Sequence, residues 1–300
     1  MQRLPEYLKR PIIDTEKTKT VRRILKTKCL NTVCEGARCP NKSECYSHNT
    51  ATFLIMGNVC TRNCRYCNIS PARPEPLDEF EPQHVAEAVK ELGLKYAVIT
   101  SVTRDDLPDG GAEHFAKCIS EIRKICDAQI EILTPDFGLH HNYLAQWERV
   151  GVREQHPLDT IINAHPDVFN HNIETVKSLF KTARPQGNYE TSIEVLKYIK
   201  ENSDIITKSG MMVGLGEGVN EIEETLYDLK NAGVDIVTIG QYIQPSKAHL
   251  EVAKYYTLEE FEDLRKLASK VGIKSYQIDP LVRSSYKAAK CHQYALCKNM

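Results

Sequence analysis

The chain has 300 residues, 41% hydrophobic and 26% charged, which allows one large domain or two small ones with a buried core. Lys and Arg number 39 against 40 Asp and Glu, so the formal net charge is -1, which argues against an extended nucleic-acid footprint and electrostatic docking to a membrane. The N-terminus lacks the apolar run of a secretory signal and the acid-poor composition of a transit peptide. We expect a cytoplasmic protein without membrane or nucleic-acid partners.

The composition of the chain changes twice along its length. Residues 1–50 are basic and rich in cysteine and predict an irregular arm with one helix near Thr20–Lys28. Residues 51–280 alternate short apolar runs with amphipathic stretches, and residues 281–300 form a C-terminal closing segment. The elements expected in residues 51–280 are, in chain order, strand Thr52–Met56, helix Gln83–Leu92, strand Tyr96–Thr100, helix Gly111–Cys126, strand Gln129–Leu133, helices Tyr143–Arg149 and Leu158–Ala164, strand Val168–His171, helix Tyr189–Glu201, strand Met211–Gly214, helix Glu221–Ala232, strand Ile236–Ile239, helix Leu258–Val271 and strand Lys274–Ile278.

Strands that alternate with long helices predict parallel βαβ units. About six such units predict a partial (β/α)6-type TIM barrel with an N-terminal cysteine-bearing arm. Two helix starts carry capping-box spacing, Asn220 with Glu223 and Thr257 with Glu260. Because chemistry in such barrels lies at the C-terminal ends of the strands, we expect the site there.

Cysteine is distributed unevenly along the chain. Seven of the 11 cysteines lie between Cys29 and Cys67. An odd count in a chain large enough for its own core argues against a disulfide scaffold. Cys118 and Cys126 fall on an expected helix, where burial is the default. We therefore expect soft metals to bind within the first 67 residues.

The sharpest motif is Cys60-Thr-Arg-Asn-Cys64-Arg-Tyr-Cys67, directly after the first barrel strand. One loop can wrap these three thiolates around a single object, and thiolates suit iron–sulfur clusters and zinc. A closed structural zinc site needs four ligands, and no fourth Cys or His follows at finger spacing. Three ligands on a [4Fe–4S] cluster would leave one iron open for chemistry.

A second triplet comprises Cys34, Cys39 and Cys45. Taken alone, it also suits zinc, with Cys29 as a fourth ligand. Beside another three-cysteine loop it favours a second cluster, whose remaining iron needs a ligand from elsewhere in the chain.

For three other features, the sequence favours a structural role or a simple ligand contact over a catalytic or cofactor-binding motif. The glycines of Gly214-Leu-Gly216-Glu-Gly218 suggest close approach of the backbone to a ligand, because Val219 stands where a dinucleotide fingerprint has its third glycine. An acidic group without EF-hand spacing predicts a solvated turn or a polar contact with a ligand; it comprises Asp105, Asp106 and Asp109. We interpret His171 as a satisfied interior histidine, with a catalytic role as the alternative.

The three-cysteine loop resembles the signature of the radical S-adenosylmethionine superfamily. Together with the second triplet and Arg283-Ser284-Ser285-Tyr286, it resembles the lipoyl synthase family over residues 29–288. The segment Gly138–His165 is longer than that family's pattern. Further segments that agree with the family are Thr100–Leu107, Asp109–Gly111, Leu133–Phe137, Phe169–Val176, Thr207–Glu217 and Thr238–Ser246.

The resemblance implies two [4Fe–4S] clusters and S-adenosylmethionine as cofactors. Cys60, Cys64 and Cys67 would hold the cluster that binds S-adenosylmethionine. Cys34, Cys39 and Cys45 would hold an auxiliary cluster, with Ser285 rather than Ser284 on its fourth iron, although the thiols of Cys291 and Cys297 are alternative ligands. The resemblance also implies catalytic roles for Arg283, Ser285 and Tyr286, and cofactor contacts from Tyr66, Asn170, Asn172, Glu174, Gly214 and Gly216.

The activity implied is radical insertion of two sulfur atoms, at C6 and C8 of an octanoyl chain that is amide-linked to a lysine. Expected partners are octanoylated lipoyl carrier domains of 2-oxoacid dehydrogenase complexes or the glycine cleavage H protein. An electron donor such as flavodoxin or ferredoxin and a cluster-assembly carrier complete the set. Two alternatives stay open: a methylthiotransferase acting on RNA, against which the near-neutral charge argues, and a zinc-stabilised binding protein.

Overall fold

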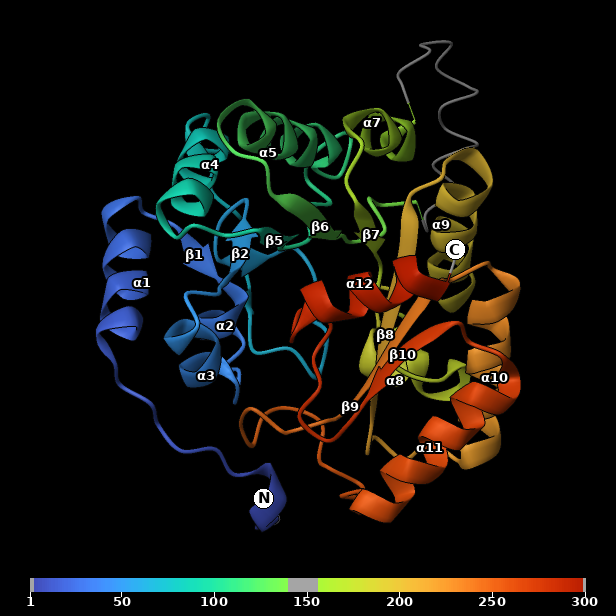
Figure 1. Cartoon of the computed structure of the whole chain (residues 1–300). Helices are drawn as coiled ribbons and strands as arrows, with labels where there is room; N and C mark the ends of the chain where they lie inside the picture. The colour runs from blue at the N-terminus through green and yellow to red at the C-terminus, as the bar shows by residue number, and fades with distance from the viewer. Residues whose placement is uncertain (1–2, 140–155, 299–300) are drawn as a thin grey trace.

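The computed structural model describes residues 3–139 and 156–298, so the expected helix Tyr143–Arg149 lies outside the described residues. Its centre is an eight-stranded sheet in the order β1-β2-β5-β6-β7-β8-β9-β10 (Figure 1). All neighbours from β2 onward are parallel, and only β1 runs antiparallel to β2. The strands are β1 Asn31–Thr32, β2 Thr52–Ile55, β5 Tyr96–Ser101, β6 Gln129–Leu133, β7 Val168–Asn170, β8 Ile206–Val213, β9 Ile236–Gln241 and β10 Ser275–Ile278, with a separate pair β3 Val59–Cys60 and β4 Ser70–Pro71.

Helices cover the outside of this sheet (Figure 1). Each buries one stripe of apolar side chains; α5, for example, buries Phe115, Ile119 and Ile122. The main helices are α4 Glu81–Glu91, α5 Ala112–Ile125, α7 Pro157–Ala164, α9 Tyr189–Asn202, α10 Val219–Asn231 and α11 Leu258–Val271. The remaining ones are η1 Glu6–Leu8, α1 Glu16–Thr27, α2 Val33–Gly36, α3 Lys42–Ser47, η2 Lys177–Leu179, α8 Phe180–Ala183 and α12 Ala288–Lys298.

The expected partial barrel is confirmed, with more strands and helices than anticipated. The seven successive parallel strands among the described residues are the seven expected in residues 51–280, and the strands β1, β3 and β4 were not expected. In the order of the sheet β1 and β10 stand at opposite ends, so the barrel is open between them. The arm carries α2 and α3 in addition to the expected helix, and the C-terminal segment contains the unexpected helix α12.

Two boundary predictions were wrong for identifiable reasons. Strand β8 begins at Ile206, five residues before the expected start, because the polar residues Lys208 and Ser209 conceal a buried strand. Helix α10 is capped by Gly218, whose backbone N–H donates to the Glu221 carboxylate at 2.7 Å, and not by Asn220. The capping box of α11 at Thr257 is confirmed.

The barrel interior contains a charged group. Lys208 and Glu131 are fully buried, with the Lys208 Nζ atom 2.9 and 3.0 Å from the two oxygens of Glu131. The amide of Asn170 and the hydroxyl of Tyr96 donate to the same carboxylate at 3.0 and 2.7 Å. A buried charge is tolerable only when it is paired and hydrogen-bonded in this way.

The C-terminal segment packs against both the barrel strands and the N-terminal arm. Apolar side chains of α12 pack against the first residues of three strands; the cluster comprises Val168, Ile206, Ile236, Cys291 and Ala295. Residues before α12 contact the arm, since the Asn41 amide donates to the carbonyl of Leu281 at 2.7 Å and the Tyr286 hydroxyl to Glu44 at 2.9 Å. The two ends of the chain thus meet across the open side of the barrel. Among the described helices, none combines the length and apolarity needed to cross a membrane.

Candidate active site

The loop Cys60–Cys67 lies over the C-terminal ends of the barrel strands, where the sequence predicted the site. Backbone hydrogen bonds join it to three other loops: Thr61 to Thr103 after β5, Arg65 to Ala183 before α9, and Leu250 after β9 to Arg65. The His249 ring donates from Nε2 to the carbonyl of Cys67 at 2.9 Å. The loop is therefore anchored on several sides of the barrel mouth.

Backbone N–H groups point at the sulfur atoms of this loop. The amides of Arg62 and Thr103 lie 3.4 and 3.3 Å from the Cys60 sulfur, and that of Ile69 lies 3.5 Å from the Cys67 sulfur. Burial raises the pKa of Cys67 to about 12, so its thiol stays protonated until a metal displaces the proton. Three sulfur donors with amides directed at two of them form a donor set that fits a [4Fe–4S] cluster with one open iron.

Arg62 fixes the shape of the same loop. Its guanidinium, 3% exposed, donates two hydrogen bonds to Asp105 at 2.6 and 2.8 Å and two to Asp136 at 2.7 and 2.8 Å. Burial alone would lower the pKa of Arg62, but the bonds to the two carboxylates raise it above its ordinary value. Asp105 was expected in a solvated turn or in contact with a ligand; in the structure it instead accepts hydrogen bonds from Arg62.

A second polar group lies between the loop and the segment that follows β7. It comprises Tyr66 of the loop with Asn172, Glu174 and Arg184. The Asn172 amide donates to Glu174 at 3.2 Å, and Arg184 donates to the Asn172 carbonyl at 3.3 Å. Burial raises the pKa of Glu174, against the opposing charge of Arg184. The backbone of Glu174 has a positive φ of 70° and hydrogen-bonds to the edge of β8, which holds its carboxyl at the barrel mouth.

The second triplet lies beside the first. Cys34 lies in α2, Cys45 in α3 and Cys39 between them, and burial raises the pKa of Cys34 to about 11 and of Cys45 to about 12. The charges of Cys34 and Cys39 also raise the pKa of Cys45. Cys29, the alternative fourth ligand, is exposed.

The two cysteine loops touch at Gly36. The Asn68 amide donates to the Gly36 carbonyl at 2.7 Å. A β-carbon at Gly36 would lie 2.6 Å from the Ile69 side chain, so only glycine fits here without displacement of a neighbour. The triplets thus occupy adjoining positions at one mouth of the barrel.

The segment Arg283–Tyr286 reaches the same region from the C-terminal side. The Ser284 hydroxyl donates to the Asn172 side chain at 2.7 Å. The hydroxyl of Ser285 has no hydrogen-bond partner among the described residues, and the charge of Cys39 acts on the buried Arg283. Of the two alternative thiol ligands, Cys291 donates to Gln277 on β10 at 2.9 Å. The side chain of Cys297 lies outside the part of the chain that the structure describes.

The remaining expected residues lie on the barrel strands or just beyond them. Asn170 faces Glu131 inside the barrel, as described above. The amides of Gly214 and Leu215 donate to the Glu217 carboxylate at 2.6 and 2.9 Å, so these two loop amides already have a partner. Gly216 follows with a positive φ of 115°, and its Cβ position meets only the side chain of Ala253.

His171 and the other two acidic residues are held by protein contacts. His171 is buried, donates from Nδ1 to the Thr134 carbonyl at 2.9 Å, and has a pKa lowered to about 4 by burial and the charge of Arg184. Asp106 pairs with Arg104, and Asp109 accepts from the first amides of α5. No group of three or more Cys, His, Asp or Glu side chains in residues 3–139 and 156–298 converges closely enough to hold a single metal ion.

Comparison with known proteins places the chain in a family. The model of the radical SAM superfamily matches residues 54–228. The chain is 48% identical over 287 residues to lipoyl synthase of Caldanaerobacter subterraneus subsp. tengcongensis, covering 95% of this chain and 96% of that protein. The chain belongs to the lipoyl synthase family. Lipoyl synthase of Rubrobacter xylanophilus is likewise 48% identical, over 95% of this chain and 85% of that protein.

Solved structures agree on the fold. Methylornithine synthase (PylB) superposes with a TM-score of 0.54 at 12% identity, covering 84% of this chain and 73% of that one. HydG, a maturase of the [FeFe]-hydrogenase, superposes with a TM-score of 0.54 at 13% identity, covering 94% and 61%. As a member of the lipoyl synthase family, the chain is a radical S-adenosylmethionine enzyme that inserts sulfur and uses S-adenosylmethionine and [4Fe–4S] clusters.

Sequence reasoning missed several residues of this lipoyl synthase site. Arg184, Asp136 and His249 each contact the first cysteine loop or its polar neighbours, and none was named as a site residue. Asp136 lies in the segment Leu133–Phe137 that agrees with the family and directly follows the end of β6, so both the resemblance and the strand-end rule for barrels could have found it.

Proposed function

We propose that the protein inserts two sulfur atoms, at C6 and C8 of an octanoyl chain amide-linked to a lysine of a lipoyl carrier domain. The single observation that carries this proposal is the adjacency of the two cysteine triplets, joined at Gly36 and covered by the Arg283–Tyr286 segment. One site can generate a radical while the other presents sulfur to the same substrate chain. A single-cluster enzyme would not need the second triplet.

In this proposal the first triplet holds the cluster that acts on S-adenosylmethionine. When bound, the two clusters supply an electron for cleavage of S-adenosylmethionine and sulfur for the product, and the protein positions and shields them. Arg62 keeps the Cys60–Cys67 loop in one shape through its two carboxylate partners. Tyr66, Asn172 and Glu174 offer an aromatic face and polar groups for S-adenosylmethionine, with Asn170, Gly214 and Gly216 proposed as further contacts.

The second triplet, with Ser285, holds the auxiliary cluster in this proposal. Ser284 is already hydrogen-bonded to Asn172, which supports Ser285 as the free oxygen donor. An oxygen ligand binds iron less tightly than a thiolate, so it suits a cluster that gives up its sulfur. Arg283 would place a buried positive charge near Cys39, and Tyr286 would hold the segment on α3 through Glu44.

The proposal assigns one task to each part of the chain. Residues 1–50 carry the sulfur-donor triplet, residues 51–280 generate the radical, and residues 281–300 close the donor side. The partners it requires are an octanoylated carrier domain, of a 2-oxoacid dehydrogenase complex or the glycine cleavage H protein, a reductant such as flavodoxin or ferredoxin, and a cluster-assembly carrier.

Mass spectrometry of an octanoyl-lysyl peptide tests this function. The peptide is incubated with reconstituted protein, reductant and S-adenosylmethionine, and we expect a product that carries two added sulfur atoms. We expect about eight irons per chain, the content of two four-iron clusters. An unmodified peptide, or a colourless zinc protein, would contradict the proposal.

Two variants separate the triplets. Cys64→Ala should abolish formation of 5′-deoxyadenosine, because its loop loses a cluster ligand. Cys39→Ala should retain 5′-deoxyadenosine formation and add no sulfur. Normal sulfur insertion by folded Cys39→Ala would reduce the second triplet to a structural role.

A further inference from the structure

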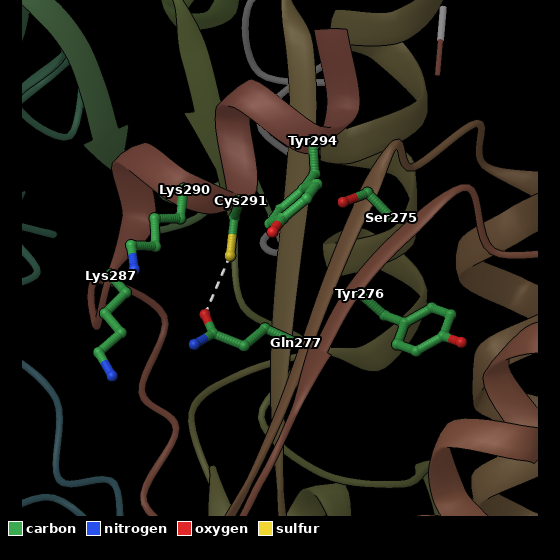
Figure 2. Close-up of a pocket in the computed structure, with 7 residues that line it drawn as sticks. All are labelled: Ser275, Tyr276, Gln277, Lys287, Lys290, Cys291 and Tyr294. Atoms are coloured by element: carbon green, nitrogen blue, oxygen red, sulfur yellow. Dashed lines mark hydrogen bonds between the residues drawn. The ribbon is translucent and has the colours of Figure 1, made fainter. Parts of the chain in front are cut away.

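A groove runs along β10, on the open side of the barrel. A pocket of about 430 Å³ lies between β10 and α12, and a second of about 390 Å³ adjoins it and shares Tyr276, Gln277 and Lys287. Figure 2 shows Lys287 and Lys290 together near the start of α12, with Tyr276 and Gln277 on the strand. We call this surface the β10 groove; its other lining residues are Arg10, Arg265, Ser275, Ile278, Asp279, Val282, Tyr286, Cys291 and Tyr294.

The groove carries an excess of positive charge. Four of its lining residues are cations and only Asp279 is an acid. Arg10 and Lys290 form no ion pair within the described chain, and both are exposed. The hydrogen bond with Tyr286 raises the pKa of Lys287, and the nearby charge of Arg10 opposes that rise. Of the other two cations, Arg265 pairs with Glu262 and Asp279, and Lys287 lies 3.9 Å from Glu44. The exposed charges of Arg10 and Lys290 therefore favour an anionic occupant.

The groove also offers aromatic surface beside the last strand of the sheet. In the described sheet β10 pairs only with β9, and Arg265 donates from Nε to the Ile278 carbonyl of β10 at 2.9 Å. Tyr294 is 68% exposed at the rim of the groove. Tyrosine and cationic side chains around a cleft are typical of protein-binding surfaces.

One end of the groove lies beside the sulfur-donor side of the site. Tyr286 and Lys287 directly follow Ser285, and both contact Glu44, the neighbour of Cys45 in α3. A protein segment seated in the groove would therefore lie next to the second triplet and over the open side of the barrel. A lysine-linked chain presented from that segment would enter the barrel mouth from this side.

We propose that the β10 groove docks an acidic segment of the carrier protein that presents the octanoyl-lysine; this proposal rests on the proposed function. The octanoyl chain itself is neutral and apolar, so it offers no charged group by which one carrier is distinguished from another protein. Recognition must come from the protein around the lysine. Electrostatic complementarity at such a surface raises association rates and selects partners.

The test compares a whole octanoylated carrier domain with a short octanoyl-lysyl peptide that has uncharged neighbours. Lys290→Glu should raise the KM for the carrier domain about tenfold or more with kcat unchanged, which is typical of a lost charge contact. Turnover of the short peptide should match that of the wild-type protein, because the peptide lacks the acidic segment. Tyr294→Ala should act in the same direction.

Lys117→Glu is the matched control, because Lys117 is an exposed lysine on α5, a helix that packs against α4 and α7. It should leave the KM for both substrates unchanged. Salt provides an independent readout. For the wild-type protein, kcat/KM on the carrier domain should fall between about 0.05 and 0.5 M salt, and for Lys290→Glu it should fall less steeply.

The outcomes separate the docking proposal from the function. Equal effects of Lys290→Glu and Lys117→Glu on the carrier domain, or equal loss on carrier and peptide, would overturn docking alone. A third outcome is that a protein electron donor reduces Lys290→Glu more slowly than the wild-type protein while the kinetics on the carrier domain are unchanged. This result would assign the groove to the electron donor and overturn the docking proposal. A wild-type protein that adds no sulfur to either substrate overturns the proposed function and the docking proposal with it.

Discussion

Replacing Asp136 by asparagine removes one charge from the buried group that fixes the first cysteine loop. The Asp136 side chain is fully buried and accepts two hydrogen bonds from Arg62, which is itself almost fully buried. Asparagine keeps the shape and one acceptor oxygen but presents an N–H group where the carboxylate accepted a bond. Arg62 would keep its two hydrogen bonds to Asp105 and lose one of its two charge-assisted bonds at position 136.

The exposure of the two carboxylates sets the expected magnitudes. Breaking a buried ion pair costs about 3–5 kcal/mol, and we place Asp136→Asn near 3 kcal/mol because Asp105 still pairs with Arg62. The Asp105 side chain is 34% exposed, so Asp105→Asn should cost about 1 kcal/mol, the upper end for exposed pairs. With about 2 °C per kcal/mol for a chain of this size, the melting temperature should fall by about 6 and 2 °C respectively.

Anaerobic thermal melts of the cluster-loaded enzymes measure these shifts. The rate at which a chelator removes iron gives a second readout, and Asp136→Asn should release iron faster than Asp105→Asn, because its Cys60–Cys67 loop is less firmly held. Formation of 5′-deoxyadenosine should fall in the same order. Equal melting temperatures for the two variants, or faster iron loss from Asp105→Asn, would refute the assignment of Asp136 as the stronger partner.

Three further predictions concern the rest of the molecule. Gly240→Ala should lose most sulfur insertion while it still cleaves S-adenosylmethionine. The reason is that a β-carbon at this position would lie 2.1 Å from the Val282 carbonyl and displace the closing segment. Unchanged product formation would contradict this prediction. Ser285→Ala should keep its iron and form 5′-deoxyadenosine but insert little sulfur, and the reverse result, with Ser284→Ala as the inactive variant, would identify the other hydroxyl as the ligand. Lys208→Met should destabilise the protein by about 3–5 kcal/mol, since it leaves a buried carboxylate unpaired; a melting temperature within about 2 °C of the wild-type value would show that this carboxylate has another cation.

The barrel and its cysteine loops could be predicted because their signals are local. Apolar runs such as Thr52–Ile55 are buried on both faces, and cysteine spacing is visible without any knowledge of the fold. The start of β8 was missed because Lys208 is polar in sequence and neutralised only by Glu131, which lies on another strand. Tertiary pairing of this kind leaves no mark in a local pattern.

The positioning residues of the site were hidden for the same reason. Asp136 hydrogen-bonds to Arg62 and the charge of Arg184 acts on Tyr66 and Cys64, both from distant parts of the chain, and the local pattern around neither residue shows that partner. Helix α12 was also missed, because its apolar side chains pack against strand ends that are far away in sequence, such as Ile206. The local pattern does not distinguish Ser284 from Ser285, since the two hydroxyls are chemically alike; the choice of Ser285 came from the family resemblance and stays a prediction.

The hydrogen bond between Asn41 and Leu281 joins residues that are 240 positions apart. During synthesis the second cysteine triplet leaves the ribosome well before the segment that contacts it, which is made about 240 residues later. At about 5–20 residues per second, the triplet waits roughly 12–48 s for this segment. Iron and sulfide delivered in that interval would meet three thiols without the proposed ligand Ser285 nearby. Productive maturation of the proposed donor site therefore belongs after residues 281–286 have been made and have folded onto the arm.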